Sequence, residues 1–504
     1  MTGATHAPAH NVADLVRRSA RRGPAHIAVL DAASGTGLTW AQLDRAVDEQ
    51  ARRLVEVGAQ PGDRIGVRLP NSPEFCVAVF GVLRAGCVVV LIGPGLPARE
   101  LQRILADSGA DLMIAEDPAD PDQAGDATVL APPSLLASDE AGDEPQLPAV
   151  GGGEDLAVLG YTSGTSGTPR GAMLSHRALL ANVDQCAALR PAPVTAADRV
   201  LLALPLFHVY GLGPGLLQVA GAGATAVLMD RFDPERALVA IEDYRVTTMV
   251  GVPPMYQALL TQPGERLREA LATVRLFTSG AAPLDPAVLA GVRQAVGLPV
   301  YEGYGLTETG PVVTTALVTG VPKPGSVGQP LPGVEVRLVD TDGRPLTLGE
   351  DLAEEAAGTG LVAVRGSNLF SGYWPDGEHG PDADGWFRTG DVGYLDADGD
   401  LHLVDRAGDL IIVNGFNVYP HEVEQVLDEL PEVAEAAVVG VPDEKTGEAV
   451  KAVLVLREGA DVAEQAVIGH CAERLAKFKV PTVVEFAEKL PHSPTGKLAR
   501  SRLR

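Results

Sequence analysis

The chain has 504 residues, more than one compact core usually holds, so a large domain and at least one smaller domain are expected. Its 46% hydrophobic and 21% charged residues are typical of a globular protein. The formal net charge of -26 argues against nucleic acid or an anionic membrane surface as partners held by bulk electrostatics. An anionic ligand therefore needs a local cluster of cations, backbone N–H groups and metal.

The cysteines and the apolar runs exclude two further classes. The four cysteines lack metal-ligand or redox spacing and are expected to be buried thiols: Cys76, Cys87, Cys186 and Cys471. The most apolar run, Cys76–Gly93, is interrupted by Arg84 and is too short for a membrane span. The N-terminus carries no signal-peptide core, so we expect a cytoplasmic protein without a membrane span.

Short β-branched runs alternate with helical patterns in the first half of the chain. The predicted strands are Arg64–Leu69, Cys87–Ile92 and Ala110–Ala115. One predicted helix begins at Glu74, and another spans Ala98–Leu105. This alternation predicts an α/β fold with parallel sheets covered by helices. The tract Glu116–Gly153, rich in Pro, Asp and Gly, is expected to be mostly a surface connection.

Two regions of different texture follow. A second α/β stretch spans Val200–Val300, with strands expected at Ala224–Leu228 and Thr248–Val252. Beyond it, the sequence becomes rich in glycine and short strands, of which Val334–Val339 and Gly360–Arg365 are the clearest. This texture predicts a β-rich subdomain.

The last hundred residues form a third pattern. Glu422–Leu430 carries apolar residues at i, i+3, i+4 and i+7, which predicts a helix, and Ala436–Val441 and Val450–Leu456 are predicted to be paired strands. We therefore expect a large N-terminal domain over residues 1–405 and a small, mobile α+β domain over residues 406–504.

A loop rich in hydroxyl groups and glycine follows the predicted strand Leu156–Tyr161. In Thr162–Gly171, five Ser or Thr residues alternate with three glycines. Such a loop can wrap its N–H groups and hydroxyls around phosphates. It is not a Walker P-loop, because the G-x-x-x-x-G-K-[ST] pattern is absent. On pattern alone, a Ser/Gly connector is an equal alternative.

Six further motifs accompany this loop. In order, the seven motifs are YTSGTSGTPRGAMLSH from Tyr161, LPLFHVYGL from Leu204, SGAAPL from Ser279, YEGYGLTE from Tyr301, GWFRTGD from Gly385, VDRAGDLIIVNGFNVYPHEVE from Val404 and PTGK from Pro494. Their order and spacing resemble those of the acyl-CoA synthetases. That family belongs to the adenylate-forming superfamily, which also contains amino-acid adenylation domains and luciferases. The resemblance covers about Leu38 to Arg504.

The resemblance implies a set of nucleotide-binding residues. The ATP phosphates would be held by Thr162, Ser163, Gly164, Thr165 and Thr168. Arg170 stands where relatives usually have Lys, which keeps the cation but replaces a point charge with a planar fork. Further residues of the nucleotide site would be Gly280, Ala281, Ala282, Gly303, Tyr304 and Gly305.

The YGLTE motif is implied to combine three roles. Tyr304 would stack on adenine, Thr307 would contact phosphate, and Glu308 would ligate Mg²⁺, a hard cation suited to a carboxylate. A single Glu in a loop is usually just solvated, so only the flanking pattern supports the metal role.

Three residues in the later motifs complete the implied site. Asp391 would accept both ribose hydroxyls, and Arg406 would reach the same region. Lys497 would contact the carboxylate and the α-phosphate as they react, where negative charge develops. Taken alone, Asp391 is better explained as a turn former and Lys497 as a flexible tail lysine, and only the surrounding motifs favour the functional roles.

The implied chemistry has two steps that use ATP, Mg²⁺ and coenzyme A. ATP and the acid give acyl-AMP and pyrophosphate, and a thiol then displaces AMP to form a thioester. In the family the small domain rotates between the steps. The implied hinge lies near residues 406–409, and Gly408 stands where relatives usually have Asp or Lys.

The acid pocket is expected to be apolar. By the resemblance, His208 would gate the pocket or contact the carboxylate, although a core histidine is the alternative. The small residues Gly280 and Gly303 leave room for an acyl or aryl group. Amino-acid adenylation domains have an Asp at the position of His208, and malonate-specific relatives have an Arg at that of Gly303, so neither substrate class is expected.

Two alternatives to a CoA ligase remain open at this point. An acyl-AMP ligase would pass the acyl group to a free-standing acyl carrier protein. A catalytically inactive relative would bind acyl groups or nucleotides only. The identity of the acid and the oligomeric state are not predicted.

Overall fold

The computed structural model describes residues 9–116, 125–135, 146–162, 169–346, 358–406, 408–413, 416–443, 445–492 and 498–503. The chain divides into two compact units. Among the described residues, the first unit extends to Glu335 and includes 365–387, and the second contains 336–346, 358–364 and the residues from Arg388 onward.

A six-stranded sheet contains the predicted strands of the first half. Its order is β6-β5-β3-β4-β7-β8, and every pair is parallel except the antiparallel pair of β7 and β8. The strands are β3 (Arg64–Arg68), β4 (Val88–Leu91), β5 (Leu112–Ala115), β6 (Thr128–Leu130), β7 (Leu156–Thr162) and β8 (Arg170–Ser175). The predicted surface connection thus contributes one short strand, β6.

A nine-stranded sheet forms the rest of the first unit's framework. Its order is β15-β14-β13-β12-β11-β9-β10-β1-β2, parallel from β1 to β13. The strands are β1 (Ile27–Asp31), β2 (Gly37–Thr39), β9 (Arg199–Leu202), β10 (Thr225–Leu228), β11 (Thr248–Gly251), β12 (Leu276–Ser279), β13 (Val300–Gly305), β14 (Val312–Thr315) and β15 (Gln329–Pro330). Because β11, β12 and β13 are parallel, their carboxyl ends lie at one edge of the sheet.

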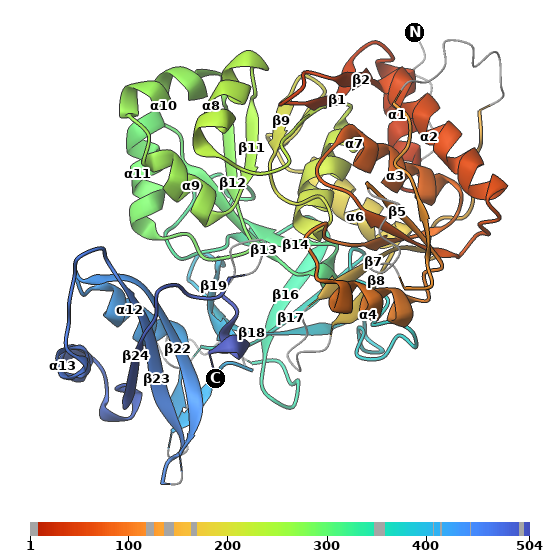
Figure 1. Ribbon diagram of the computed structural model, residues 1–504. Coiled ribbons are helices and arrows are strands. Elements are labelled where there is room, and N and C mark those ends of the chain that lie inside the picture. The colour runs from red at the N-terminus through yellow and green to blue at the C-terminus, as the bar shows by residue number, and fades with distance from the viewer. Residues whose placement is uncertain are drawn as a thin grey trace. The chain divides into compact units, whose positions relative to one another are not determined.

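Helices accompany both sheets, as the α/β pattern predicts. They are α1 (Asp14–Arg22), α2 (Trp40–Glu56), α3 (Pro73–Arg84), α4 (Ala98–Ser108), α6 (His176–Ala187), α7 (Gln218–Ala222), α8 (Pro234–Asp243), α9 (Pro253–Leu260), α10 (Gly264–Ala270) and α11 (Pro286–Val296). Figure 1 shows α8 to α11, in green, beside β11 and β12. Of the helices in the described part of the chain, none combines the length and apolar character of a membrane span.

Local sequence explains where the helices begin. At α2 a capping box forms, in which the Thr39 side chain accepts from Gln42 N at 3.2 Å and the Gln42 side chain accepts from Thr39 N at 2.8 Å. At α3 the Ser72 hydroxyl accepts from Phe75 N and Pro73 occupies the first helical position. The four cysteines are buried and form no disulfide.

Most residues of two smaller sheets belong to the second unit. One has the order β16-β17-β18-β19, from β16 (Val334–Val339), β17 (Gly360–Gly366), β18 (Phe387–Leu395) and β19 (Leu401–Arg406). The other has the order β21-β20-β23-β22, with β24 paired to β23, from β20 (Ile411–Val413), β21 (Phe416–Val418), β22 (Val433–Asp443), β23 (Gly447–Leu456) and β24 (Val483–Phe486). Its apolar core includes residues of α12 (Pro420–Asp428) and α13 (Glu464–Arg474).

Candidate active site

The hydroxyl-rich loop connects two paired strands. β7 ends at Thr162 and β8 begins at Arg170, and these two residues are antiparallel partners. Ser163, Gly164, Thr165 and Thr168 lie outside the described residues, as does Lys497. The two ends of the predicted phosphate loop are therefore held together by the β7–β8 ladder.

The YGLTE motif lies directly against β7. Thr307 begins a short 3-10 helix, Thr307–Thr309. A Cβ added to Gly160 would lie 2.8 Å from Thr307 Cγ2, so only glycine allows this approach. The structure thereby brings Thr307 beside the strand that leads into the predicted phosphate loop.

Arg170 and Glu308 are linked by an aromatic side chain that the sequence analysis missed. The Arg170 guanidinium carbon lies 4.1 Å from the centroid of the Tyr373 ring. The Tyr373 hydroxyl donates to Glu308 Oε1 at 2.5 Å, and Glu308 is buried. The cation stacks on the ring and the carboxylate accepts from its hydroxyl, so the three form one cluster of mixed charge.

Glu308 retains the chemistry of a metal ligand in this cluster. A carboxylate has two acceptor oxygens, and Tyr373 donates to one of them. Oxygen donors of this kind suit Mg²⁺. The residues present therefore fit the predicted metal role of Glu308.

Close backbone packing fixes the end of β13. A Cβ on Gly305 would lie 1.8 Å from Pro311 O, and one on Gly303 would lie 3.1 Å from Thr314 O. Tyr304, between them, is buried. The two glycines thus let β13 lie close to the chain beside it while the Tyr304 side chain packs into the interior.

The segment from Ser279 to Leu284 leaves β12 at the same edge. A Cβ on Gly280 would lie 2.9 Å from Tyr210 Cζ, so this glycine packs against the Tyr210 ring. The Tyr210 hydroxyl donates to Gly251 O at 3.2 Å. Ala281 has a φ of 68°, a left-handed conformation that is uncommon for alanine. The segment therefore has a defined and locally strained path.

The ring orientation of His208 is defined by a hydrogen bond from Tyr210, the residue that packs against Gly280. Its Nδ1 accepts from Tyr210 N at 3.2 Å, which leaves the proton of the neutral ring on Nε2. The chain continues into a π-helix, Gly211–Leu217, a form often found at functional sites. His208 is half-buried.

Glu302 is a second residue that the sequence analysis did not select. It is 4% exposed, and its Oε2 accepts from Leu284 N at 3.1 Å. Burial raises the pKa of Glu302 to about 7, and the hydrogen bond from Leu284 opposes the shift. The alternation in Val300–Gly305 was a usable signal, because it places Glu302 on the buried face with Tyr304.

Asp391 and Arg406 form a pair within the second unit. They are partners across β18 and β19, and Arg406 Nε lies 3.1 Å from Asp391 Oδ1. The sequence assigned both to one region, and the structure brings them together.

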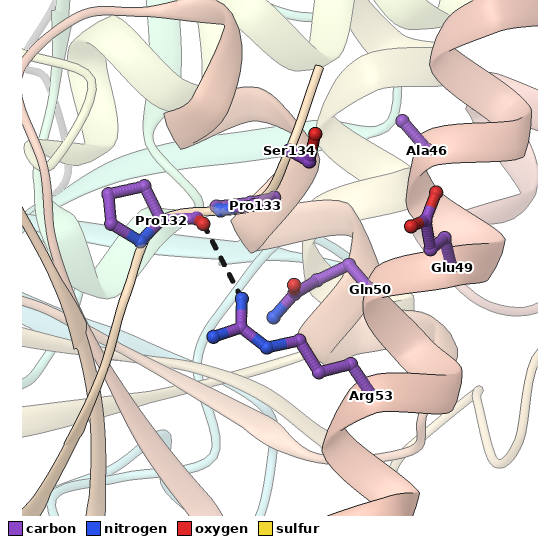
Figure 2. A pocket seen from close by; sticks show the side chains of 7 residues that line it. All are labelled: Ala46, Glu49, Gln50, Arg53, Pro132, Pro133 and Ser134. Carbon is purple, nitrogen blue, oxygen red and sulfur yellow. Dashed lines mark hydrogen bonds between the residues drawn. The ribbon is translucent and has the colours of Figure 1, made fainter. Parts of the chain in front are cut away.

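A pocket lies against α2, away from the predicted residues. It is lined by Ala46, Glu49, Gln50, Arg53, Pro132, Pro133 and Ser134, and the Arg53 guanidinium donates to Pro132 O (Figure 2). No residue predicted for ATP or acid is part of its lining.

Comparison with known proteins identifies the family. Residues 16–374 match the AMP-binding enzyme family, and residues 422–497 match the AMP-binding enzyme C-terminal domain. A feruloyl-CoA synthase from Amycolatopsis sp is 39% identical over 97% of each chain. The chain belongs to the AMP-binding enzyme family.

Solved structures agree with this assignment. ATP-bound MatB from Rhodopseudomonas palustris is 35% identical, with a TM-score of 0.88 over 98% of each chain. An o-succinylbenzoate CoA synthetase from Bacillus subtilis, in complex with its acyl-adenylate intermediate, is 30% identical, with a TM-score of 0.85 over 99% of each chain. The predicted family and the α/β fold with a smaller C-terminal part are confirmed.

The enzyme class follows from the family. The protein is an AMP-forming acid–thiol ligase, which uses ATP to convert a carboxylic acid to acyl-AMP and then forms the thioester with coenzyme A. Mg²⁺ accompanies ATP in this family. The two alternatives, a carrier-protein ligase and an inactive relative, are not favoured.

Proposed function

We propose that this ligase activates a hydrophobic carboxylic acid, with an aromatic acid as its preferred substrate. The cluster of Arg170, Tyr373 and Glu308 supports the ATP-dependent activation, because it joins a cation and a metal-type carboxylate beside the strands that flank the phosphate loop. The aromatic preference rests on the 39% identity to a feruloyl-CoA synthase.

The nucleotide is proposed to bind along the edge defined by β7 and β13. Its phosphates would contact Thr162, Ser163, Gly164, Thr165, Thr168, Arg170 and Thr307. Its adenine would stack on Tyr304 beside Gly280, Ala281 and Ala282. Glu308 would hold Mg²⁺, which supplies positive charge to the phosphates. Asp391 and Arg406 would bind the ribose, where the carboxylate accepts from the two hydroxyls.

The first step forms a mixed anhydride. A carboxylate oxygen of the acid attacks the α-phosphorus of ATP, and the bond from that phosphorus to the β-phosphate oxygen breaks, which releases pyrophosphate. Lys497 would stabilise the negative charge that develops, and Arg170 would hold the phosphates in line. The acid would lie beside His208, Gly280 and Gly303.

The second step forms the thioester. The sulfur of CoA attacks the acyl carbon, the bond from that carbon to the AMP oxygen breaks, and the thiol proton is released to solvent. We propose a catalytic N-terminal domain over residues 1–405 and a lid over residues 406–504. The lid would turn about residues 406–409, where Gly408 permits a wide change of backbone angles. A cytoplasmic location is also proposed, because ATP and CoA are both available there.

The principal test is acid-dependent exchange of labelled pyrophosphate into ATP. A panel of aromatic and aliphatic acids of graded length is compared, and we expect exchange with hydroxycinnamate-like acids at the highest kcat/KM. Absence of exchange with every hydrophobic acid would refute the proposal. Thioester formation with CoA and with carrier proteins then identifies the thiol, and we expect CoA to be used.

The role of Lys497 separates the two steps. We expect Lys497→Ala to lower adenylation about a hundred- to a thousandfold, because it removes a preorganised charge, while transfer from supplied acyl-AMP to CoA is retained. Lys489→Ala, which changes an exposed lysine earlier in the sequence, serves as the matched control and should stay within about twofold of wild type. Equal loss of both half-reactions in Lys497→Ala would contradict the role.

A further inference from the structure

Two buried polar side chains on the adjacent strands β12 and β13 of the nine-stranded sheet have no role in the proposed mechanism. Ser279 and Glu302 are partners across the parallel strands β12 and β13, and they are 1% and 4% exposed. Ser279 Oγ and Glu302 Oε1 have no hydrogen-bond partner among the residues that the structure describes. Buried polar atoms are rarely left in this condition, so these two require a functional explanation.

The other oxygen of Glu302 ties a loop to the sheet. Glu302 Oε2 accepts from Leu284 N, at the far end of the segment that begins at Ser279. The near end is held by packing, since Gly280 lies against the Tyr210 ring. Between these two anchors, Ala281 keeps its left-handed conformation. Such a conformation persists only where the surroundings hold it.

Glu302 is also close in sequence to the predicted adenine contact. Glu302 and Tyr304 alternate onto the same buried face of β13. The carboxyl group therefore connects the strand that carries Tyr304 to the segment that carries Gly280–Ala282. A change in this connection alters the separation of the two elements.

We propose that Glu302 is a positioning residue for the nucleotide. Its carboxyl group, through Leu284 N, fixes the segment Ser279–Leu284 relative to Tyr304, so that both elements are arranged before ATP binds. This inference rests on the proposed function, which assigns these elements to ATP. Preorganisation of this kind improves affinity because less ordering is required on binding.

Two variants of Glu302 separate positioning from packing. Glu302→Gln keeps an oxygen acceptor of the same reach for Leu284 N, whereas Glu302→Met keeps an unbranched side chain of similar length without an oxygen acceptor. The dissociation constant of ATP is measured by calorimetry in the absence of acid, and the KM of the acid is measured by pyrophosphate exchange.

We expect Glu302→Met to lose affinity for ATP without a change in the KM of the acid, and we expect the conservative variant Glu302→Gln to keep its ATP affinity. We expect Glu302→Met to weaken ATP binding about tenfold, which is the effect of one lost hydrogen bond, with the KM of the acid within about twofold of wild type. Glu302→Gln should bind ATP within about twofold of wild type. Unchanged ATP affinity in Glu302→Met, an equal loss in Glu302→Gln, or a parallel rise in the KM of the acid would each overturn the proposal.

A measurement on the wild-type protein covers the case in which Glu302→Met does not fold. Hydrogen exchange of the Leu284 amide should be slow already in the absence of ATP, because its hydrogen bond to Glu302 holds the segment before the nucleotide binds. Exchange of this amide in the ATP-free protein at the rate of an unprotected amide would overturn the proposal. If wild type binds ATP and no acid supports exchange, the proposed function fails while the ATP affinities still decide the role of Glu302.

Discussion

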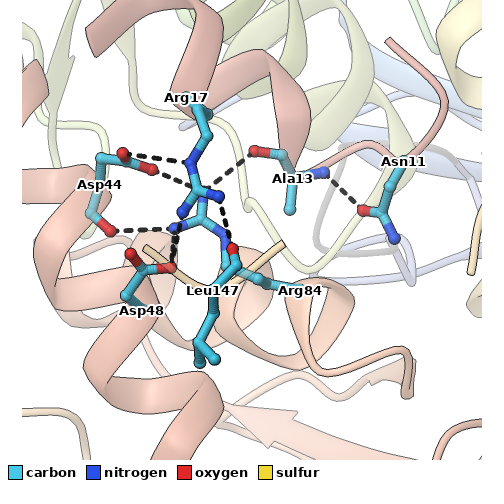
Figure 3. A network of polar contacts seen from close by, with 7 residues as sticks. All are labelled: Asn11, Ala13, Arg17, Asp44, Asp48, Arg84 and Leu147. Carbon is cyan, nitrogen blue, oxygen red and sulfur yellow. Dashed lines mark hydrogen bonds and ion pairs between the residues drawn. The ribbon is translucent and has the colours of Figure 1, made fainter. Parts of the chain in front are cut away.

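Two buried polar regions of the first unit differ in how completely their groups are paired. Near the N-terminus, Arg84 contacts Asp44 at 2.7 Å and Asp48 at 2.8 Å, and Arg17 contacts the same two carboxylates (Figure 3). Each of the four charged side chains therefore has two charged partners. At the ends of β12 and β13, by contrast, Ser279 Oγ and Glu302 Oε1 are buried without partners in the described part of the chain.

The contrast distinguishes a structural use of buried polarity from a functional one. The N-terminal network also satisfies backbone groups, because Arg17 donates to Leu147 O and Arg84 donates to Ala13 O. Such a network joins distant segments and leaves little for a ligand to contact. At the ends of β12 and β13, buried polar atoms lack hydrogen-bond partners in the described part of the chain and lie next to a segment proposed to bind a nucleotide. We therefore assign the N-terminal network to stability and the region of β12 and β13 to binding.

The largest expected effect is the loss of a cation from the paired region. Arg84→Met should lower the free energy of unfolding by about 3–5 kcal/mol, because the carboxylates of Asp44 and Asp48 stay buried with one cation fewer. Urea unfolding followed by tryptophan fluorescence measures this change, since all three tryptophans lie in the first unit.

An exposed ion pair supplies the control for Arg84. Arg365 donates to both oxygens of Glu335, but both side chains are substantially exposed. Arg365→Met should therefore cost less than about 1 kcal/mol, because water and salt screen the pair. Similar losses in the two variants would show that burial of the network contributes nothing.

The unpaired region should respond to pH. Burial raises the pKa of Glu302 to about 7 from an ordinary value near 4.5, so the folded protein retains a proton that the unfolded chain releases. The stabilisation is complete below about pH 4.5 and is lost as pH rises through 7, by about 3 kcal/mol in total. The stability of wild type relative to Glu302→Gln should therefore fall across this interval, and urea unfolding at several pH values measures the difference.

A buried histidine that contacts the N-terminal segment gives stability a pH dependence of the opposite sign. His176 Nδ1 accepts from Val12 N at 3.0 Å, and burial lowers the pKa of His176 to about 4. Its neutral form stabilises the fold above about pH 6.5, and this contribution is lost as pH falls toward 4. Because both proteins in the Glu302→Gln comparison contain His176, its effect cancels. Parallel pH profiles for wild type and Glu302→Gln would contradict the raised pKa.

Much of the framework could be predicted from local pattern. Apolar β-branched runs predicted β3, β4 and β5. The motifs assigned Thr307, Glu308 and Arg170 to one phosphate-binding and metal-binding site. The contact of Thr307 with Gly160 needed the structure, since a glycine's lack of a side chain does not indicate what occupies the space. Pattern therefore fixes which residues belong to a site more readily than it fixes their contacts.

The remaining site residues depend on long-range packing. Tyr373 is 65 residues from Glu308 and lies outside the seven motifs, so no local period connects the two. The pairing of Glu302 with Leu284 depends on the register of β12 and β13, which one sequence does not specify. Both residues act through partners that become neighbours only when the sheets assemble.

The smallest expected effect concerns the cluster of Arg170, Tyr373 and Glu308, whose polar groups contact one another and are also proposed to bind the nucleotide and its metal. Tyr373→Phe removes the hydroxyl that donates to Glu308 and retains the ring on which Arg170 stacks. We expect a roughly tenfold rise in the KM for ATP with Mg²⁺, because a hydrogen bond to a charged group contributes about 1.5 kcal/mol, and little change in the KM of the acid. Tyr373→Leu, which also removes the stacking surface, should have a further severalfold effect. If Tyr373→Phe matched wild type while Tyr373→Leu did not, the ring would be the functional group, and Glu308 would bind its cation without help from the hydroxyl.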